Sequence, residues 1–434
     1  MSVRSLLSAL LAVATLAGCD DVQNPDNLSS TSASPAMQPA PTTAGVYGSA
    51  AVRPPPAQLA AIGKLMFFDA SLSASGKLAC SSCHDPRHAY GPPNQLSVQL
   101  GGKDLRGAGQ RAAPSLRYLQ QLPPFTEHFH ENDGDDSKDQ GPTGGHDWDG
   151  RADSAHAQAA GPLLSENEMG NVTRDALVAK LRTTSYASTF RQTFGADIFD
   201  HPEEAYAAAT MALEVFQQSP VEFYPYTSKY DAYLRGEAKL TRQELHGLDL
   251  FNDPAKGNCA SCHQSAITSS GFPSFTDFGH VALGAPRNRK LPANADPAYF
   301  DMGLCGPQRS DLSARKEYCG LFRTPTLRNV AVKGAFFHSG VFHSLEEVLA
   351  FYAQRDSHPR KWYAIADRMA NSDIHPFDDL PDAYRENVYR DAPFDRQRKG
   401  KDALSSAERR DIIAFLKTLT DADVASAAPT NEKR

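Results

Sequence analysis

The sequence has no segment in which lysine and arginine gather, and its formal net charge is −7. Nucleic-acid phosphates are bound by clusters of these residues, so the charge pattern argues against a nucleic acid as partner. The sequence also lacks a convincing run of alternating apolar and polar residues, the pattern that indicates β-strands. Where apolar residues are periodic their spacing is helical, and we therefore expect a mainly α fold.

The apolar run at residues 6–16 is too short to span a bilayer stably. It follows Arg4 and leads into Leu-Ala-Gly-Cys19, an order typical of a lipoprotein signal peptide over residues 1–18. In such signals the peptidase cuts before the cysteine, and Cys19 would carry the lipid anchor. An ordinary cleaved signal followed by a chance cysteine is the alternative. Both predict export to the periplasm, and Asp20 favours retention on the inner membrane.

Large apolar side chains are nearly missing from residues 20–51, which consist mainly of Ser, Thr, Pro, Ala, Gln and Asn. Such a composition cannot bury a core, so we expect residues 19–51 to form a disordered tether. The chain from residue 52 to about residue 425 is long enough for two or more domains.

Cysteine is scarce, but four of the seven cysteines fall in two Cys-x-x-Cys-His units. The units are Cys80, Cys83 and His84, and Cys259, Cys262 and His263. A zinc site would need further ligands nearby at finger-like spacing, and a thioredoxin-like disulfide would need a βαβ setting, which the surrounding sequence lacks. Two thiols at this spacing add to the haem vinyl groups as thioethers, and the adjacent imidazole coordinates the iron. The sequence therefore predicts two covalent c-type haems with His84 and His263 as iron ligands.

Several apolar stripes are preceded by residues that start helices. The expected starts are Pro56, Thr173, Thr241, Ser344 and Ser405, and the last three have Glu at capping-box spacing. The first helix would carry Leu59, Ile62, Leu65 and Met66 on one face. Long loops rich in Gly and Pro separate the helices, which suits two cytochrome c-like domains. We place an N-terminal domain at 52–224 and a C-terminal domain at 225–425.

The chain from about residue 63 to residue 421 resembles the bacterial dihaem cytochrome c peroxidase and MauG family. The matching segments, in the family's order, are Gly63–Asp69, Trp148–Asp153, Gln158–Gly170, Phe275–Phe278, Phe322–Val330, His338–Gly340 and Asp411–Leu419. The resemblance implies that the haem on His84 is the open, peroxidatic one. It implies that the haem on His263 is six-coordinate and handles electrons.

The resemblance also assigns roles around the peroxidatic haem. Gln158, Pro162 and Glu168 match the family's distal pocket, with the proline crowding the open face and the glutamate as acid/base. Moving a proton between the two oxygens of peroxide needs such a group. From the residues alone, Glu166 is as good a candidate for this role as Glu168. The alternative for both is a solvated loop carboxylate without a catalytic role. Trp148 matches the tryptophan between the two haems, a relay for electrons or holes; otherwise it would be a loop-packing residue.

The sixth ligand of the second haem is the position that separates the family's branches. Fourteen residues after the position of His338 the peroxidases have methionine and MauG has tyrosine; here the residue is Tyr352. Leu345, Val348 and Tyr352 share one helical face, so the phenol is expected to point inward. A core tyrosine is the alternative. A phenolate favours oxidised iron, whereas a thioether raises the reduction potential, so Tyr352 is the MauG-like choice.

Three differences limit the resemblance. The family's calcium site uses an asparagine where this chain has Ala112, and carbonyls of a segment that here contains Lys333, so calcium is doubtful and Lys333 is a candidate to replace it. The surface tryptophan of MauG corresponds to Gly257. The segment 120–147 is longer than usual and contains His128, His130 and His146; it is open to interpretation as a solvated flap, a metal site or a latent haem ligand.

The two remaining cysteines, Cys305 and Cys319, are expected to form a disulfide, with two buried thiols as the alternative. Three functions fit the sequence. The first is a MauG-like enzyme that uses hydrogen peroxide to oxidise a protein or small molecule. The second is a peroxide-scavenging peroxidase fed by a small cytochrome. The third is an electron-transfer protein without peroxidase activity. Tyr352 favours the first over the second, and Glu168 with its neighbours disfavours the third.

Overall fold

A computed structural model describes residues 54–130, 138–269, 271–363, 375–397 and 400–427. The expected signal peptide, the Cys19 anchor and the tether up to residue 51 lie outside the described residues and stay predictions. All described residues fall in one compact unit, Ala44–Arg434. Within them no helix is both long and apolar enough to cross a membrane.

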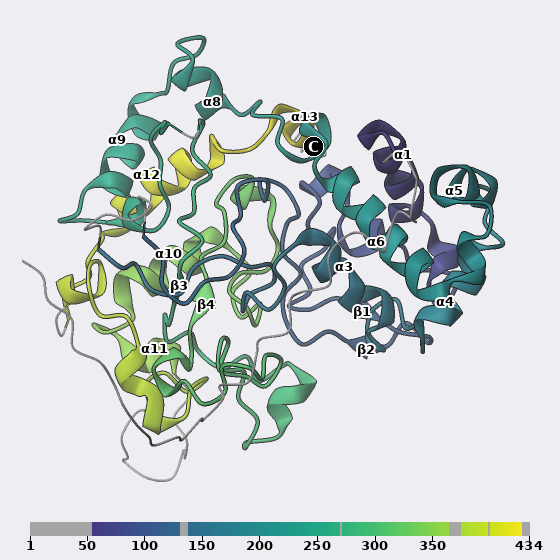
Figure 1. Cartoon of the computed structure of the whole chain (residues 1–434). Helices are drawn as coiled ribbons and strands as arrows, with labels where there is room; N and C mark the ends of the chain where they lie inside the picture. Colours follow the sequence, from purple (N-terminus) through teal and green to yellow (C-terminus); the bar gives the residue numbers. More distant parts are fainter. Residues whose placement is uncertain (1–53, 131–137, 270, 364–374, 398–399, 428–434) are drawn as a thin grey trace, which may run out of the picture. The chain divides into compact units, whose positions relative to one another are not determined.

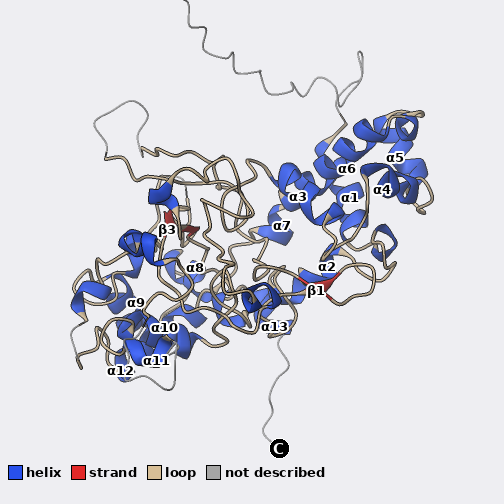
Figure 2. Ribbon diagram, turned by 90° about the horizontal axis from the view of Figure 1, so that it is seen from below, coloured by secondary structure: helices blue, strands red, loops and turns tan. Residues whose placement is uncertain are grey.

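The expectation of a mainly α fold is confirmed (Figure 1). The helices are α1 (Pro56–Phe67), α2 (Cys80–Cys83), α3 (Ala155–Leu164), α4 (Arg174–Leu181), α5 (Ala187–Phe194), α6 (Pro202–Gln217), α7 (Pro220–Phe223), α8 (Lys229–Leu234), α9 (Arg242–Asn252), α10 (Leu345–Gln354), α11 (Pro359–Trp362), α12 (Ser406–Lys417) and α13 (Ala422–Ala427). Figure 2 shows how much of the chain between them is loop.

The described strands are two residues long and form two antiparallel pairs. Strand β1 (Leu100–Gly101) pairs with β2 (Gly107–Ala108), and β3 (His280–Val281) pairs with β4 (Phe322–Arg323). Each pair links segments of loop rather than building a sheet, which agrees with the missing alternation in the sequence.

Helix α1 packs against α6, and its glycine makes the contact close. A Cβ on Gly63 would lie 2.0 Å from the carbonyl oxygen of Ala212, so only glycine fits at this crossing. Leu59, Ile62 and Met66 are buried as expected. Leu65 is 48% exposed, so its assignment to the buried face was wrong. The helix buries only the stripe that meets α6, and residue 65 lies outside that stripe.

A second helix pair, α9 and α12, repeats this construction. A Cβ on Gly247 of α9 would lie 2.0 Å from the carbonyl oxygen of Asp411. Both α1 and α9 precede a Cys-x-x-Cys-His unit in the chain. The two units therefore follow the same kind of helix crossing.

The predicted helix starts are largely confirmed. Thr173 Oγ1 accepts from the Ala176 amide at 3.1 Å. Reciprocal capping boxes form at Thr241 with Glu244 and at Ser405 with Glu408. Ser344 also caps its helix, but Glu347 accepts from the amide of His343 instead of that of Ser344, so that box is not closed.

The buried apolar side chains divide into two large clusters. The first contains residues between Ile62 and Phe223, and the second contains residues between Tyr230 and Leu419. The predicted domain boundary at 224/225 falls between them. The assignment of one haem domain to each cluster stays a prediction.

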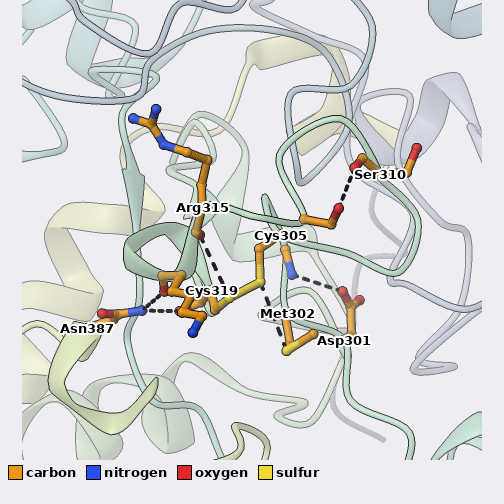
Figure 3. The surroundings of a disulfide bond; sticks show 10 residues. Asp301, Met302, Cys305, Ser310, Arg315, Cys319 and Asn387 are labelled. Atoms are coloured by element: carbon orange, nitrogen blue, oxygen red, sulfur yellow. Dashed lines mark hydrogen bonds between the residues drawn. A yellow bond between two sulfur atoms is a disulfide. The ribbon is translucent and has the colours of Figure 1, made fainter. Parts of the chain in front are cut away.

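The expected disulfide between Cys305 and Cys319 is present, with the two Cα atoms 4.9 Å apart (Figure 3). It closes a segment whose C-terminal end is also fixed by the Asn387 side chain, which donates to the Cys319 carbonyl at 3.0 Å. A loop of this length gains about 3 kcal/mol of stability from such a bond in the chain-entropy account. The alternative of two buried thiols is wrong.

Candidate functional site

The first Cys-x-x-Cys-His unit lines a cavity together with α3 and the loop that follows it. Cys80 and Cys83 begin and end the short helix α2, and the amide of His84 donates to the Cys80 carbonyl at 2.9 Å. His84 Nδ1 lies 3.1 Å from the carbonyl of Tyr90. Because a carbonyl only accepts, Nδ1 carries the proton and Nε2 keeps its lone pair for a metal.

The second unit is built the same way in a second cavity. The amide of His263 donates to the Cys259 carbonyl at 2.8 Å, and His263 Nδ1 donates to the carbonyl of Phe275 at 2.9 Å. Burial lowers the pKa of His263 to about 4, so its imidazole is neutral and able to coordinate.

The two carbonyls that orient the histidines come from residues with the same unusual backbone. Tyr90 has φ 54° and Phe275 has φ 55°, both in the left-handed region that bulky residues seldom adopt. Both side chains are fully buried in the apolar clusters, which hold these conformations in place. Both sites therefore use local backbone strain to aim a carbonyl at a histidine.

The four motif cysteines fit covalent haem better than a metal thiolate. None of them forms a disulfide in the described part of the chain. Burial raises the pKa of Cys80 and Cys259 to about 12. Zinc ligands must be thiolates, which these surroundings disfavour, whereas neutral thioethers suit an apolar cavity. The walls include Phe67, Leu163 and Leu213 in the first cavity and Phe251, Leu349 and Leu416 in the second.

Two buried cations next to the cavities also fit haem. Arg323 lines both cavities; its Nη1 has no hydrogen-bond partner among the described residues, and burial lowers its pKa to about 10. Lys333 lines the second cavity, and burial, followed by the charge of Arg323, lowers its pKa to about 8. A buried cation without a counterion is costly. The two carboxylates that a haem carries would supply that counterion.

Helix α3 brings two of the predicted distal residues to the first cavity. Gln158 and Pro162 are four residues apart and lie on one helical face, and both line the cavity. Ser154 caps the helix by accepting from the amide of Ala157 at 3.3 Å. After its last residue the chain turns back, and the amide of Glu168 donates to the Ser165 carbonyl at 3.0 Å.

Glu168 lies in that turn and lines the same cavity as the first haem unit. The residue after β1 fixes the turn, because Gly102 donates its amide to the Glu168 carbonyl at 2.8 Å. Burial, and then the charge of Asp147, raise the pKa of the Glu168 carboxyl above its usual value. Glu166 lines the cavity as well. Geometry alone thus brings both glutamates to the site, and the raised pKa belongs to Glu168.

His146 and Met169 line the first cavity too. Met169 belongs to the apolar cluster. His146 is held neutral, because burial lowers its pKa to about 4. The interpretation of the whole segment 120–147 as a solvated flap is therefore wrong at His146. His128, by contrast, is exposed and pairs with Asp139 at 2.6 Å.

Tyr352 lies on α10 and lines the second cavity, as do Leu345 and Val348 of the same face. Its ring stacks with the rings of Phe337 and Phe394, at centroid distances of 6.2 and 5.6 Å. Burial raises the pKa of the phenol. A bound iron would stabilise the phenolate, so the group fits the role of an iron ligand on the cavity that contains His263.

Trp148 lines both cavities. Its Nε1 donates to the carbonyl of Ala112 at 2.8 Å, and its own carbonyl accepts from the Arg323 amide at 2.8 Å. The amide of Ala112 donates in turn to the His338 carbonyl at 2.7 Å. The tryptophan is thus fixed by residues that belong to both halves of the chain.

Metal ions other than iron have no evident protein cage here. Among the described residues, no group of three or more His, Cys, Asp or Glu side chains is arranged to hold a metal ion. Ala112 offers no side-chain ligand, and Lys333 places an ammonium in the second cavity. Residues 131–137 of the histidine-containing segment lie outside the described part.

The sequence reasoning missed a polar group beside the first cavity. Arg151 contacts Asp147, Asp149 and Gln308, and Gln308 comes from the segment that the disulfide closes. Asp147 and Arg151 flank Trp148 in the chain, a position that could have drawn attention to them. Gln308 is 157 residues from Arg151, and no local pattern announces it.

Comparison with known proteins agrees with the geometry. A family model described as "Di-haem cytochrome c peroxidase" matches residues 57–239. The methylamine utilization protein MauG of Paracoccus denitrificans (strain Pd 1222) is 33% identical over 376 residues, which cover 85% of this chain and 90% of that protein. Cytochrome c551 peroxidase of Nitrosomonas europaea is 28% identical over 301 residues, covering 69% of this chain and 74% of that protein.

Among solved structures, the diheme peroxidase BthA from Burkholderia thailandensis E264 is similar, with a TM-score of 0.76 and 39% identity. The likeness covers 88% of this chain and 90% of that one. Both halves of the chain, with both Cys-x-x-Cys-His units, therefore take part in the similarity.

Proposed function

Because the chain belongs to the family of dihaem cytochrome c peroxidases and MauG, we propose that it reacts with hydrogen peroxide at the first cavity and shares the oxidising equivalents with the second. It is a dihaem peroxidase-type oxidoreductase. The substrate of the proposed MauG-like reaction is a protein or small molecule that gives up electrons through the second site.

One observation carries the proposal: the two cavities are alike around the Cys-x-x-Cys-His units, but the remaining residues that line them differ. Gln158, Pro162 and Glu168 line the first, and Tyr352 lines the second. A site with an acid/base group and room for a small molecule suits peroxide. A site with a phenol facing the cavity suits a six-coordinate iron.

In the first cavity, a haem held by Cys80, Cys83 and His84 would supply the two electrons that reduce peroxide to water. Glu168 accepts a proton from one oxygen of hydrogen peroxide and returns it to the other, which leaves as water. Its raised pKa brings it closer to neutral pH, where a group that both takes and gives a proton works best.

In the second cavity, Cys259, Cys262 and His263 would hold the other haem, with Tyr352 as the sixth ligand. A phenolate is a hard anion that favours oxidised iron. This ligand therefore suits a site that stores an oxidising equivalent. Trp148, in contact with both cavities, is the relay between them.

The route by which electrons leave the oxidised partner differs from that of MauG, because the position of the MauG surface tryptophan is occupied here by Gly257. A Cβ on Gly257 would lie 2.6 Å from the Leu250 carbonyl oxygen, so a larger side chain does not fit without a backbone shift. A tryptophan that collects electrons at this position is excluded by packing as well as by sequence. We further propose that the protein works in the periplasm, anchored to the inner membrane by lipid on Cys19.

Calcium is not required in this proposal. Lys333 lines the second cavity beside Arg323, and the charge of Arg323, after burial, lowers the pKa of the Lys333 ammonium, so two positive charges already act on this region. We propose that Lys333 takes the place of a bound cation.

The experiment is a titration of the fully oxidised protein with hydrogen peroxide, followed by optical and paramagnetic resonance spectra. The expected result is a long-lived oxidised state that changes the spectra of both haems without prior reduction. A protein that reacts only after one-electron reduction would instead be a peroxidase fed by a small cytochrome. A protein that does not react in either state would be an electron-transfer protein.

A further inference from the structure

Asp147 lines the first cavity with a backbone conformation that few residues adopt. Its φ is 65°, in the left-handed region. Arg323 Nε donates to the Asp147 carbonyl at 3.0 Å, and the following residue is the buried Trp148. This strained link holds the Asp147 carboxyl and the Trp148 ring at the same cavity.

The Asp147 carboxylate orients the amide of Gln158. Gln158 Nε2 donates to Asp147 Oδ1 at 3.2 Å. An ionised carboxylate only accepts hydrogen bonds, so it selects the amide orientation whose NH2 group faces Asp147. Gln158 Oε1 is then the end that remains to accept a hydrogen bond from a molecule in the cavity.

Arg151 fixes the other oxygen of Asp147. Its Nη2 lies 3.1 Å from Asp147 Oδ2, and its Nη1 donates to Gln308 Oε1 at 3.2 Å. Nη1 also contacts the fully buried Asp149 at 3.1 Å. The Asp147 side chain is 15% exposed and that of Arg151 is 36% exposed, so the carboxylate end of this ion pair is shielded from water and the guanidinium end is open to it. The carboxylate is therefore held in one place from both sides.

We propose that Asp147 is a positioning residue for the peroxide reaction, an inference that rests on the proposed function. By fixing the Gln158 amide, Asp147 leaves Oε1 to accept a hydrogen bond from an O–H group of hydrogen peroxide. The peroxide is thereby oriented for the proton transfer that Glu168 carries out. Asp147 takes no part in that proton transfer; burial, opposed by the charge of Arg151, leaves the pKa of its own carboxyl above the usual value.

The charge of Asp147 has a second effect in the same cavity. It disfavours the ionised form of Glu168 and so contributes to the raised pKa of that carboxyl. The charged and polar groups that act on Asp147 are Gln158, Arg151, Asp149, Arg111, Arg323 and Glu168. Replacing Asp147 by a neutral residue of the same shape removes its negative charge, so the pKa of Glu168 falls.

The first test compares Asp147→Asn with wild type by stopped-flow mixing of the oxidised holoprotein with hydrogen peroxide. An asparagine offers either NH2 or oxygen to Gln158, so the orientation is lost and the rate is expected to fall by about 10- to 100-fold. Glu237→Gln removes an exposed carboxylate that lines neither cavity and is expected to react like wild type. An unchanged rate in Asp147→Asn overturns the proposal. Haem content and optical spectra are matched first, and Asp147→Ser is used if Asp147→Asn does not load haem.

A double-mutant cycle separates positioning from a general structural effect. If Asp147 acts through Gln158, then Asp147→Asn costs little further rate in a Gln158→Ala background. Fully additive losses would show that Asp147 does not act through Gln158 and would overturn the proposal.

Infrared difference spectra recorded against pH, without peroxide, give a readout independent of turnover. The Glu168 carboxyl band, assigned with Glu168→Gln, is expected to titrate at lower pH in Asp147→Asn than in wild type. If the titration of the Glu168 band is not shifted in Asp147→Asn, the charge of Asp147 does not contribute to the raised pKa of Glu168. A wild-type protein that does not react with peroxide would refute the proposed function, whereas normal wild-type reactivity with an unaffected Asp147→Asn refutes only this inference.

Discussion

The two cavities are built alike around their histidines and differently elsewhere. Each has two half-buried cysteines and a histidine oriented by a backbone carbonyl, and the residue that supplies this carbonyl has a left-handed φ, Tyr90 in one and Phe275 in the other. Each follows a helix crossing that only glycine permits. These shared features serve attachment and coordination, which both sites need.

The differences come from segments far from the motifs in the chain. The α3 helix and the turn after it bring an amide, a proline and a carboxyl to the first cavity. The α10 helix brings a phenol to the second. The comparison shows that the motif fixes the cofactor, whereas distant segments set what the iron at each site would do.

The largest effect is expected from Glu168→Gln, which removes the proposed acid/base group and changes the first cavity alone. We expect the reaction of the oxidised protein with peroxide to slow by about 100-fold or more, within the range for such a group. Stopped-flow absorbance measures the rate, with Glu166→Gln as the matched control. Both haems should stay bound, because Glu168 makes no part of either attachment. Wild-type kinetics in Glu168→Gln would remove it from the mechanism.

Tyr352→Met tests the second cavity. It replaces the tyrosine that MauG has at this position by the methionine that the peroxidases have. A thioether in place of a phenolate raises the reduction potential of the second haem, by on the order of 100 mV, within the span of about 0.8 V that axial ligands cover. A redox titration followed by paramagnetic resonance measures it. The potential of the first haem should not change; equal shifts at both, or at neither, would contradict the ligand assignment.

The pH dependence of the peroxide reaction provides a finer comparison. Glu168 must be ionised to take a proton, and burial raises its pKa above the usual value. The rate should therefore fall with decreasing pH through that raised pKa, by about tenfold per pH unit well below it. Rate measurements across pH reveal this limb, which should be missing in Glu168→Gln. A limb that persists in the variant would belong to another group.

Calcium removal is expected to have no effect on the peroxide reaction. If Lys333 replaces a bound cation, chelation with EDTA leaves the peroxide reaction and both haem spectra unchanged. Elemental analysis of the purified protein should find less than one tightly held calcium per chain. A stoichiometric calcium retained through gel filtration contradicts the role of Lys333.

The features that could be read from the sequence are local ones. The Cys-x-x-Cys-His spacing, the caps at Thr173, Thr241 and Ser405, and the inward face of Tyr352 depend on residues within a turn or two of each other. Leu65 was misassigned because periodicity gives the apolar face of α1, but only the position of α6 decides how much of that face is covered.

The sequence by itself determined that the chain is mainly helical and which residues lie on each helical face, and it predicted where the cofactor attaches, because these follow from spacing along the backbone. Only the tertiary structure placed Arg151 between Asp147 and Gln308, gave Gln158 its carboxylate partner, and buried Arg323 Nη1 without a hydrogen-bond partner among the described residues. Such contacts join segments far apart in the chain, and their energies depend on burial and distance, which no local pattern contains.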